Sequence, residues 1–323
     1  MGRNKVETRI TKLLNIEYPI LQGGMAWVAT HELAAAVSES GGLGIIAAGN
    51  APANVIGEQI DKLKELTDKP FGVNIMLLSP FAEDIVDMIC DKGVPVVTTG
   101  VGNPGKFIEK LKQHNVKIIP VVPTVSLAKR LEKFGADALI VEGTEAGGHI
   151  GELTTMAVVP QVVDAVNIPV IAAGGIGDNR GFLAALSLGA EGVQLGTRFV
   201  CSKEAKVHQR YKEKIIESKD RDAIVTGRST GYPVRVLKNR FTKEYLDLEK
   251  QGIDFETLEK LGVGRLRKAV QEGDIDNGSL MAGQISGLIG DVKSCKEIIE
   301  DLVFGSQKAI ERLSSLIGGG DNE

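Results

Sequence analysis

Cysteine and aromatic residues are scarce in this sequence. Three cysteines occur among 323 residues, they lie far apart, and none forms a C-x-x-C pair. This usage excludes a zinc ribbon and a disulfide framework, and it is typical of a reducing compartment. Aromatic residues make up 4% of the chain, which is too few for the stacking surfaces that bind single-stranded nucleic acid.

Long hydrophobic segments are also missing. No apolar stretch reaches the roughly 18 residues that a membrane helix needs, and the polar start at Met1–Ile10 lacks the apolar core of a signal peptide. We therefore expect a soluble, cytoplasmic protein without a membrane partner. A metal-binding spacing of His, Asp and Glu is absent, as is a Gly-x-Ser-x-Gly nucleophile motif.

Neither sign of charge dominates the whole chain. The net charge of −4 argues against binding of nucleic acid. Between residues 203 and 243, however, 12 Lys and Arg accompany 5 Asp and Glu, a local charge of +7 that leaves −11 on the rest. A solvated helical surface is one interpretation of this segment.

Glycine, by contrast, is abundant, and it punctuates a regular pattern. The first 200 residues alternate short Val- and Ile-rich runs with amphipathic helical segments, one pair about every 25 residues. Eight such pairs predict a closed (β/α)8 TIM barrel, and an open doubly wound sheet is the alternative. The expected strands are Pro19–Gln22, Gly42–Ala48, Phe71–Leu77, Val94–Thr99, Lys117–Val122, Ala138–Glu142, Pro169–Ala173 and Gly192–Phe199.

Three parts of the chain are expected from this texture. Residues 1–222 would form the barrel, residues 223–290 a small helical subdomain over the barrel mouth, and residues 291–323 a C-terminal helix that packs back on the barrel. Within the second and third parts, helices are expected at Thr242–Gln251, Asp254–Glu272 and near Cys295–Ile317. The expected barrel helices are His31–Ser40, Ala53–Thr67, Phe81–Lys92, Pro104–Asn115, Val125–Phe134, Thr155–Val166, Asn179–Leu188 and Ala205–Ser218.

The loops that follow the strands carry the candidate site, because barrels of this kind build their sites at the carboxyl ends of the strands. Gly174-Gly175 and Gly196-Thr197 follow strands seven and eight, the usual phosphate site of the architecture. His149 lies in a Gly-Gly-His turn after strand six. It is the candidate acid–base residue, and a hydrogen-bonded structural histidine is the alternative.

Six short motifs occur together over nearly the whole chain: Gly-Gly-Met-Ala-Trp at 23–27, Phe-Gly-Val-Asn at 71–74, Glu-Ala-Gly-Gly-His at 145–149, Ala-Ala-Gly-Gly-Ile at 172–176, Gln-Leu-Gly-Thr-Arg-Phe at 194–199 and Met-Ala-Gly-Gln at 281–284. With them the sequence resembles the superfamily of nitronate monooxygenases and FMN-dependent enoyl reductases. The resemblance is closest to the type II enoyl-acyl-carrier-protein reductases. Because the motif at 145–149 occurs with both activities, it does not separate them.

The resemblance implies an FMN at the barrel mouth, with its phosphate on the main chain after strands seven and eight. The isoalloxazine ring would lie along the loops after strands one, three and six, and Glu142 stands where nitronate monooxygenases tend to carry Gln. The implied cofactor-binding residues are Gly24, Met25, Ala26, Asn74, Glu142, Gly147, Gly148, Gly174, Gly175, Gln194, Leu195, Gly196, Thr197, Met281, Gln284 and Ser286.

The resemblance also implies a reaction. NADH or NADPH would reduce the flavin, a trans-2-enoyl thioester of type II fatty acid synthesis would receive the hydride, and His149 would assist as a hydrogen-bond or proton donor. Oxidation of alkyl nitronates with oxygen is the alternative activity. A flavin-free isomerase or binding barrel and a non-catalytic carrier-binding module also remain open. Relatives imply a homodimer and a response to monovalent cations.

An acidic acyl carrier protein gives the basic segment a second interpretation, because opposite charge steers such a partner. The residues expected to attract it are Lys203, Lys206, Arg210, Lys212, Lys214, Arg235, Lys238 and Arg240.

Overall fold

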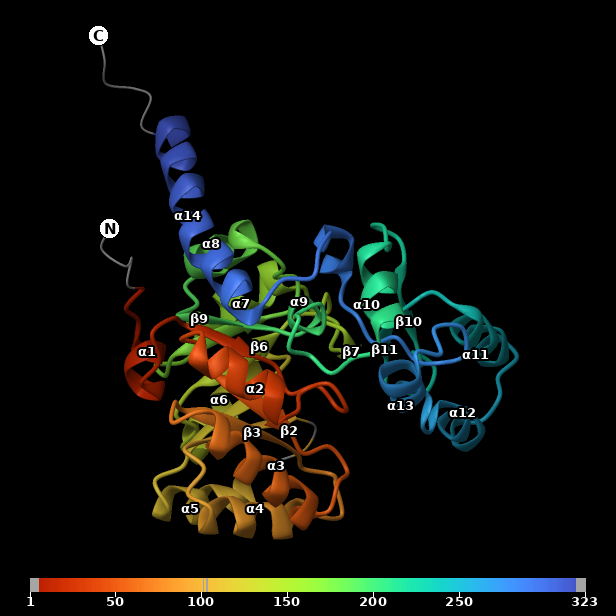
Figure 1. Cartoon of the computed structure of the whole chain (residues 1–323), viewed down its shortest axis with the longest axis horizontal. Coiled ribbons are helices and arrows are strands. Elements are labelled where there is room, and N and C mark those ends of the chain that lie inside the picture. The colour runs from red at the N-terminus through yellow and green to blue at the C-terminus, as the bar shows by residue number, and fades with distance from the viewer. Residues whose placement is uncertain (1–5, 101, 103, 318–323) are drawn as a thin grey trace.

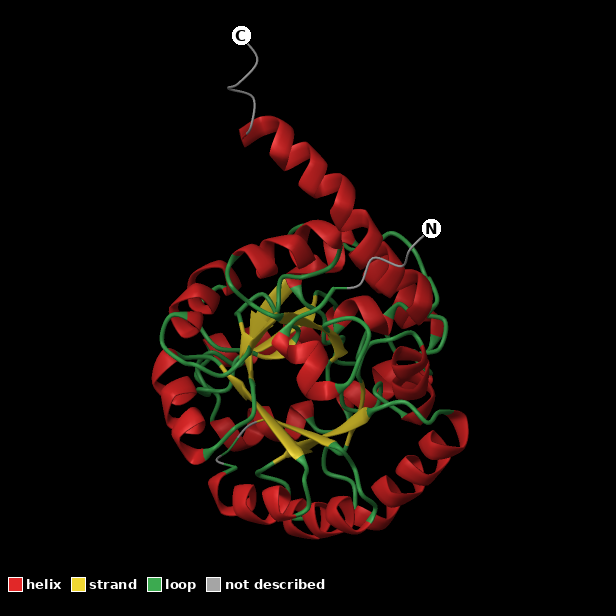
Figure 2. Ribbon diagram, turned by 90° about the vertical axis from the view of Figure 1, so that its left-hand side faces the viewer, coloured by secondary structure: helices red, strands yellow, loops and turns green. Residues whose placement is uncertain are grey.

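A computed structural model describes residues 6–100, 102 and 104–317. Eight parallel strands follow the order β1-β9-β8-β6-β5-β4-β3-β2, and Figure 2 shows them as an inner ring surrounded by helices. The TIM barrel is thus confirmed, and the open sheet is wrong. The strands are β1 (Ile20–Gln22), β2 (Gly44–Ala47), β3 (Phe71–Met76), β4 (Val96–Gly100), β5 (Lys117–Val122), β6 (Leu139–Glu142), β8 (Val170–Ala173) and β9 (Gly192–Leu195).

The barrel closes between β1 and β2 through a side chain as well as the main chain. Leu21 and Leu43 form a single parallel bridge. Beside it, the side-chain amide of Gln22 accepts from Ile45 N and donates to Ile45 O, both at 3.1 Å. A buried glutamine therefore replaces ladder hydrogen bonds that two such short strands do not form.

Each barrel strand is followed by a helix, and capping residues mark several of the helix ends. Asp178 accepts hydrogen bonds from Arg180 N and Gly181 N at the start of α8. Gly135 ends α6 with a φ of 96°, which a glycine adopts without strain. The helices are α2 (His31–Glu39), α3 (Ala53–Leu66), α4 (Ala82–Asp91), α5 (Gly105–Gln113), α6 (Val125–Phe134), α7 (Thr155–Val163), α8 (Asn179–Ser187) and α10 (Gln209–Ile216).

The eighth expected strand is too long. It was expected to extend to Phe199, but β9 ends at Leu195 and a short helix, α9 (Thr197–Val200), follows. The four helical residues are all buried, and the side chains of Phe199 and Val200 join the apolar core from a helix as they would from a strand. Periodicity alone does not separate these two structures over so few residues.

The segment after α10 contains strands as well as helices. β10 (Ala223–Thr226) and β11 (Val234–Leu237) pair with each other, and β11 pairs with β7 (Gly148–His149), which lies in the loop after β6. The expected helix at Asp254–Glu272 is interrupted at Gly264, whose φ is 75°. The remaining elements are α11 (Arg240–Lys250), α12 (Phe255–Gly262), α13 (Arg265–Arg267), a π-helix (Lys268–Glu272) and a 3-10 helix (Gln284–Leu288).

The two ends of the barrel differ. Residues of α1 (Arg9–Leu14) join the apolar core inside the barrel, and Ile10 lies near Gly192, the first residue of β9. α1 therefore closes the amino end of the barrel. Figure 1 shows β10, β11 and α11–α13 at the opposite end, which is the mouth. The final helix α14 (Cys295–Ile317) has the expected bounds and packs against α8.

Candidate functional site

Polar side chains form the top layer of the barrel interior. Inward and outward residues alternate along a strand. Ile140 belongs to the interior core, so Glu142, two residues further, also points inward. Val73 packs in the outer core, so Asn74 points inward, and the same alternation applies to Gln194. Three polar side chains from β3, β6 and β9 therefore surround the mouth.

Glu142 is the titratable member of this layer. Within the described part of the chain, its carboxylate has no hydrogen-bond partner and no ion-pair partner. Burial disfavours the charged form and raises the pKa of Glu142 to about 7. A carboxyl group that is partly protonated near neutral pH can donate as well as accept a hydrogen bond at the mouth.

This raised pKa predicts a pH-dependent stability. The folded chain holds the Glu142 proton more tightly than the unfolded chain does. The resulting contribution of Glu142 to the free energy of unfolding is complete below the ordinary pKa of 4.5. It is then lost as the pH rises to about 7. We expect the free energy of unfolding to fall less between pH 5 and pH 8 in the Glu142→Gln variant than in the parent protein, because glutamine does not titrate. Denaturant titration at several pH values measures this difference. An unchanged pH dependence would contradict the burial of this carboxylate.

The loop after β1 lies on the polar layer. A Cβ atom on Gly24 would come within 2.3 Å of the Cβ atom of Asn74, so only glycine lets the main chain pass here. Met25 is half-buried, whereas Ala26 and Trp27 are exposed. Main chain and side chains of this loop therefore both border the mouth.

The loops after β8 and β9 offer unpaired main-chain donors. Gly174 and Gly175 have φ angles of 84° and 72°, a left-handed conformation that suits glycine. Among the described residues, no acceptor faces the N–H groups of Gly175, Gly196 or Thr197. Leu195 points its side chain into the outer core, so only its main chain borders the mouth. These amides could bind an anion such as a phosphate.

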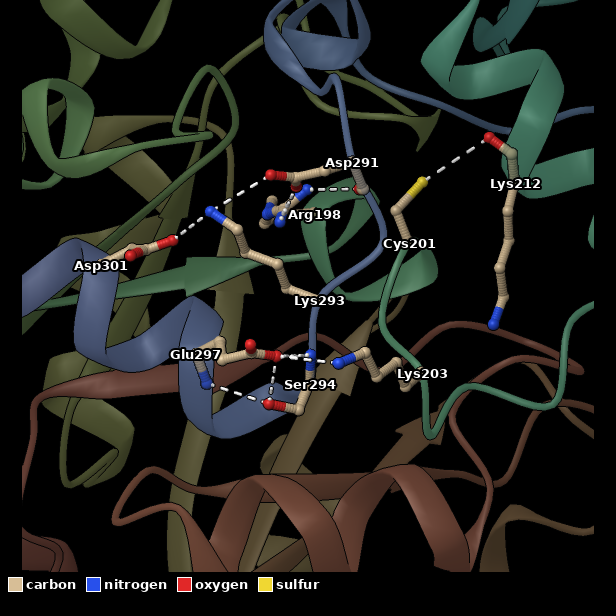
Figure 3. Close-up of polar contacts among 9 residues, drawn as sticks. All are labelled: Arg198, Cys201, Lys203, Lys212, Asp291, Lys293, Ser294, Glu297 and Asp301. Carbon is tan, nitrogen blue, oxygen red and sulfur yellow. Dashed lines mark hydrogen bonds and ion pairs between the residues drawn. The ribbon is translucent and has the colours of Figure 1, made fainter.

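A buried arginine and the ion pairs around it anchor the second of these loops. Arg198 follows Thr197 directly, and its guanidinium donates to Asp291 O at 3.1 Å and to Asp291 Oδ1 at 2.6 Å (Figure 3). Lys293 pairs with the same carboxylate and with Asp301 of α14. The C-terminal helix thereby supports the position of the Gly196-Thr197 amides from outside the barrel.

The loop after β6 carries His149 and is held at several points. The Glu145 carboxylate accepts from Thr155 N at 2.9 Å and caps α7, so this acid has a structural task. His149 lies opposite Val234 in the β7–β11 pair. Its side chain is exposed at the mouth, and the surrounding protein still desolvates the ring enough to lower its pKa. The imidazole is therefore neutral at pH 7.

The segment after β11 and the helices returns to the mouth and packs on this loop. Gly283 N donates to Thr197 Oγ1, and Gln284 N donates to Glu145 O, both at 2.9 Å. A Cβ atom on Gly147 would come within 2.7 Å of the main chain of this returning segment. The segment thus connects the loops after β6 and β9.

The three site residues predicted on the returning segment have different environments. Met281 is half-buried, and its Sδ lies 3.6 Å from where a Cβ atom of Gly148 would be. The side chain of Gln284 is exposed. Ser286 is fully buried, and its Oγ has no hydrogen-bond partner among the described residues. A buried hydroxyl group of this kind indicates a missing ligand or water.

Two basic residues expected on the surface are buried instead. Lys212 donates through Nζ to Ser202 O at 2.6 Å and to Ala205 O at 2.8 Å. Arg235 donates through Nε to Thr144 O at 3.0 Å. Their positions in the basic segment do not reveal this burial, because their partners are main-chain carbonyls. Nor does the sequence mark Glu145 as a capping residue, because it lies ten residues before Thr155, whose N–H donates to it.

Comparisons with known proteins agree with this architecture. The nitronate monooxygenase family model matches residues 7–89 and 80–305. A probable nitronate monooxygenase of Staphylococcus saprophyticus is 36% identical, over 95% of this chain and 100% of the relative. An octahydroindene-carboxyl-CoA dehydrogenase of Mycobacterium tuberculosis is 32% identical, over 97% of this chain and 99% of the relative.

A solved structure shows a higher identity. FabK from Thermotoga maritima is 52% identical and superposes with a TM-score of 0.94, over 97% of this chain and 100% of that structure. The chain belongs to the nitronate monooxygenase family.

Proposed function

We propose that the protein is an FMN-dependent enoyl-acyl-carrier-protein reductase that uses NADH or NADPH. The observation that supports this most is the full-length similarity to FabK, at 52% identity. The geometry agrees, since unpaired amides, a polar layer and His149 all lie at the mouth of one barrel.

The residues at the mouth fit a flavin mononucleotide. The free N–H groups of Gly175, Gly196 and Thr197 suit its phosphate, and the side chains of Asn74 and Gln194 suit the polar edge of its ring. The unpartnered Ser286 Oγ is a further group that a bound ligand would satisfy. When bound, the flavin supplies the transfer of hydride from the nicotinamide to the enoyl thioester.

His149 supplies the polar assistance that this reaction needs. Negative charge develops on the thioester oxygen as the β-carbon gains hydride, and a placed N–H donor stabilises that charge. A neutral imidazole can donate a hydrogen bond to this oxygen through one of its two ring nitrogens. The α-carbon also requires a proton, and His149 can relay one from water: one ring nitrogen gives up its proton while the other ring nitrogen takes up a proton.

An acyl carrier protein is the proposed partner, and the exposed part of the basic segment is the proposed docking surface. Lys206, Arg210 and Arg240 are exposed, and no ion pair involves them among the described residues. Lys212 and Arg235 are buried and leave the proposed surface. We expect reversal of the three exposed charges to glutamate to lower kcat/KM about 10-fold with carrier-bound substrate, and to spare the acyl-CoA substrate.

A matched control reverses three exposed lysines on the barrel wall: Lys62, Lys69 and Lys133. Steady-state kinetics at low ionic strength should show no change with either substrate, because these side chains lie on other elements. Equal losses with carrier-bound and CoA-bound substrate in the first variant would refute the docking surface.

Oxidation of alkyl nitronates is the second candidate function. The matching family model and the staphylococcal relative favour it. With a neutral nitroalkane as the substrate, His149 would first remove the proton next to the nitro group, which gives the nitronate that is then oxidised. One experiment separates the two functions: anaerobic oxidation of NADH that requires crotonyl thioester supports the reductase, whereas oxygen uptake with a nitronate and no NADH supports the oxygenase.

We also propose that residues 223–290 act as a lid on the barrel that ends at residue 222, and that α14 of the C-terminal part supports it; residues 1–5 and 318–323 of the expected parts lie outside the described residues. A homodimer, a response to monovalent cations and a cytoplasmic location complete the proposal. None of the described helices is both long and apolar enough to cross a membrane.

A further inference from the structure

Arg235 is a buried charge that forms no ion pair within the described part of the chain, although the Glu145 carboxylate attracts it at longer range. Its side chain is on β11, and only 5% of the residue is exposed. The guanidinium donates to two main-chain carbonyls, Thr144 O at 3.0 Å and Ala223 O at 3.4 Å. Burial of an arginine in this way is unfavourable unless its hydrogen bonds bring a compensating gain.

The two contacts of Arg235 with the His149 loop are at different points. Its main chain pairs with Gly148 in the β7–β11 ladder, and its side chain holds Thr144 near the beginning of the same loop. On the N-terminal side of Arg235, Val234 lies opposite His149, and Ile150 N donates to Pro233 O at 3.1 Å. One residue therefore fixes both ends of the segment that ends at the imidazole.

We propose that Arg235 is the positioning residue for His149, holding the loop from Thr144 to His149 against β11. The inference rests on the proposed function only for the task of His149, because the placement of the loop can be measured without any reaction. The charged groups on the elements that meet at β7 are Arg235 and Arg228 of the β10–β11 hairpin, and Glu145 and Glu152 of the loop.

Two neutral variants of equal length separate hydrogen bonding from charge. In Arg235→Gln, the side-chain N–H donor occupies the position of Arg Nε, the atom bonded to Thr144 O, whereas Arg235→Met retains the length without a donor. NMR titration of the full-length protein then reports on His149. We expect its pKa to rise by about half a unit in the methionine variant, as the ring becomes more solvated, and to stay near the parent value in the glutamine variant.

Arg228→Met is the matched control, since Arg228 is an exposed arginine of the same hairpin that pairs with Glu152. It should leave the His149 titration unchanged. Turnover of an enoyl thioester should fall about 10-fold in Arg235→Met and recover in Arg235→Gln. An unshifted His149 pKa in Arg235→Met would overturn the proposal, and so would equal shifts in the methionine and glutamine variants, because loss of charge would then explain both.

If neither variant folds, hydrogen exchange of the parent protein decides. Positioning requires the Ile150 amide to exchange together with the amides of β11, and exchange about 10-fold faster or more would overturn it. A protein that shows the His149 shift but reduces no enoyl thioester would contradict the proposed function and leave the positioning intact.

Discussion

Turnover of an enoyl thioester is expected to fall about 10²-fold or more when His149 is replaced by alanine. The imidazole is the one acid–base group on β7 at the mouth, and its lowered pKa keeps it neutral and able to donate near pH 7. Flavin content should persist, because the proposed phosphate donors are main-chain amides of other loops. Single-turnover kinetics together with the visible absorption of the purified variant measure both quantities.

His114→Ala is the control for this substitution. His114 lies at the exposed end of α5, where its ring contacts only the main chain of Lys110 among the described residues. Its removal should change neither turnover nor flavin content. Loss of flavin from the His149 variant would instead assign this histidine a structural task at the cofactor.

The Gly147→Ala variant is expected to bind FMN roughly 5- to 150-fold more weakly, the affinity change that about 1–3 kcal/mol of overpacking produces. Its new methyl group would lie 2.7 Å from the main chain at Ala282 and Gly283. Since backbone on both sides cannot yield as a flexible side chain would, the returning segment must move away from the mouth. Titration of the flavin-free protein with FMN, followed by fluorescence, measures the affinity.

Gly262→Ala provides the comparison for this glycine. Gly262 is the last residue of α12, and no heavy atom lies within 4 Å of the position of an added Cβ. FMN affinity should remain that of the parent, with a small gain in stability, because alanine has fewer unfolded conformations. Parent-like FMN binding by Gly147→Ala would show that the returning segment does not belong to the flavin site.

Much of the barrel could be predicted because its strands are buried on both sides. Such strands are nearly continuous apolar runs. Val170–Ala173 is an example, because all four of its residues are apolar and buried. Helix ends were equally clear where Asp178 or Gly135 provides the cap. The final helix, Cys295–Ile317, follows its hydrophobic periodicity over its whole length.

The β7–β10–β11 sheet could not be predicted, for reasons of length and distance. β7 is a strand of two residues, and its partner lies more than 80 residues further along the chain. Its pairing depends on tertiary structure that no local pattern encodes. Arg235 and Lys212 were expected at the surface for a related reason, since charged side chains are mostly exposed and carbonyl partners leave no sequence signal.

The late position of β11 in the sequence also sets an order of events during synthesis. The last of the eight barrel strands ends at Leu195. Arg235, which donates to the carbonyl of Thr144, is synthesised 91 residues after Thr144. A nascent chain can therefore complete its barrel while the histidine loop still lacks its neighbour strand. We therefore expect a chain that ends just before residue 234 to contain all eight barrel strands, with the β7 segment still unpaired.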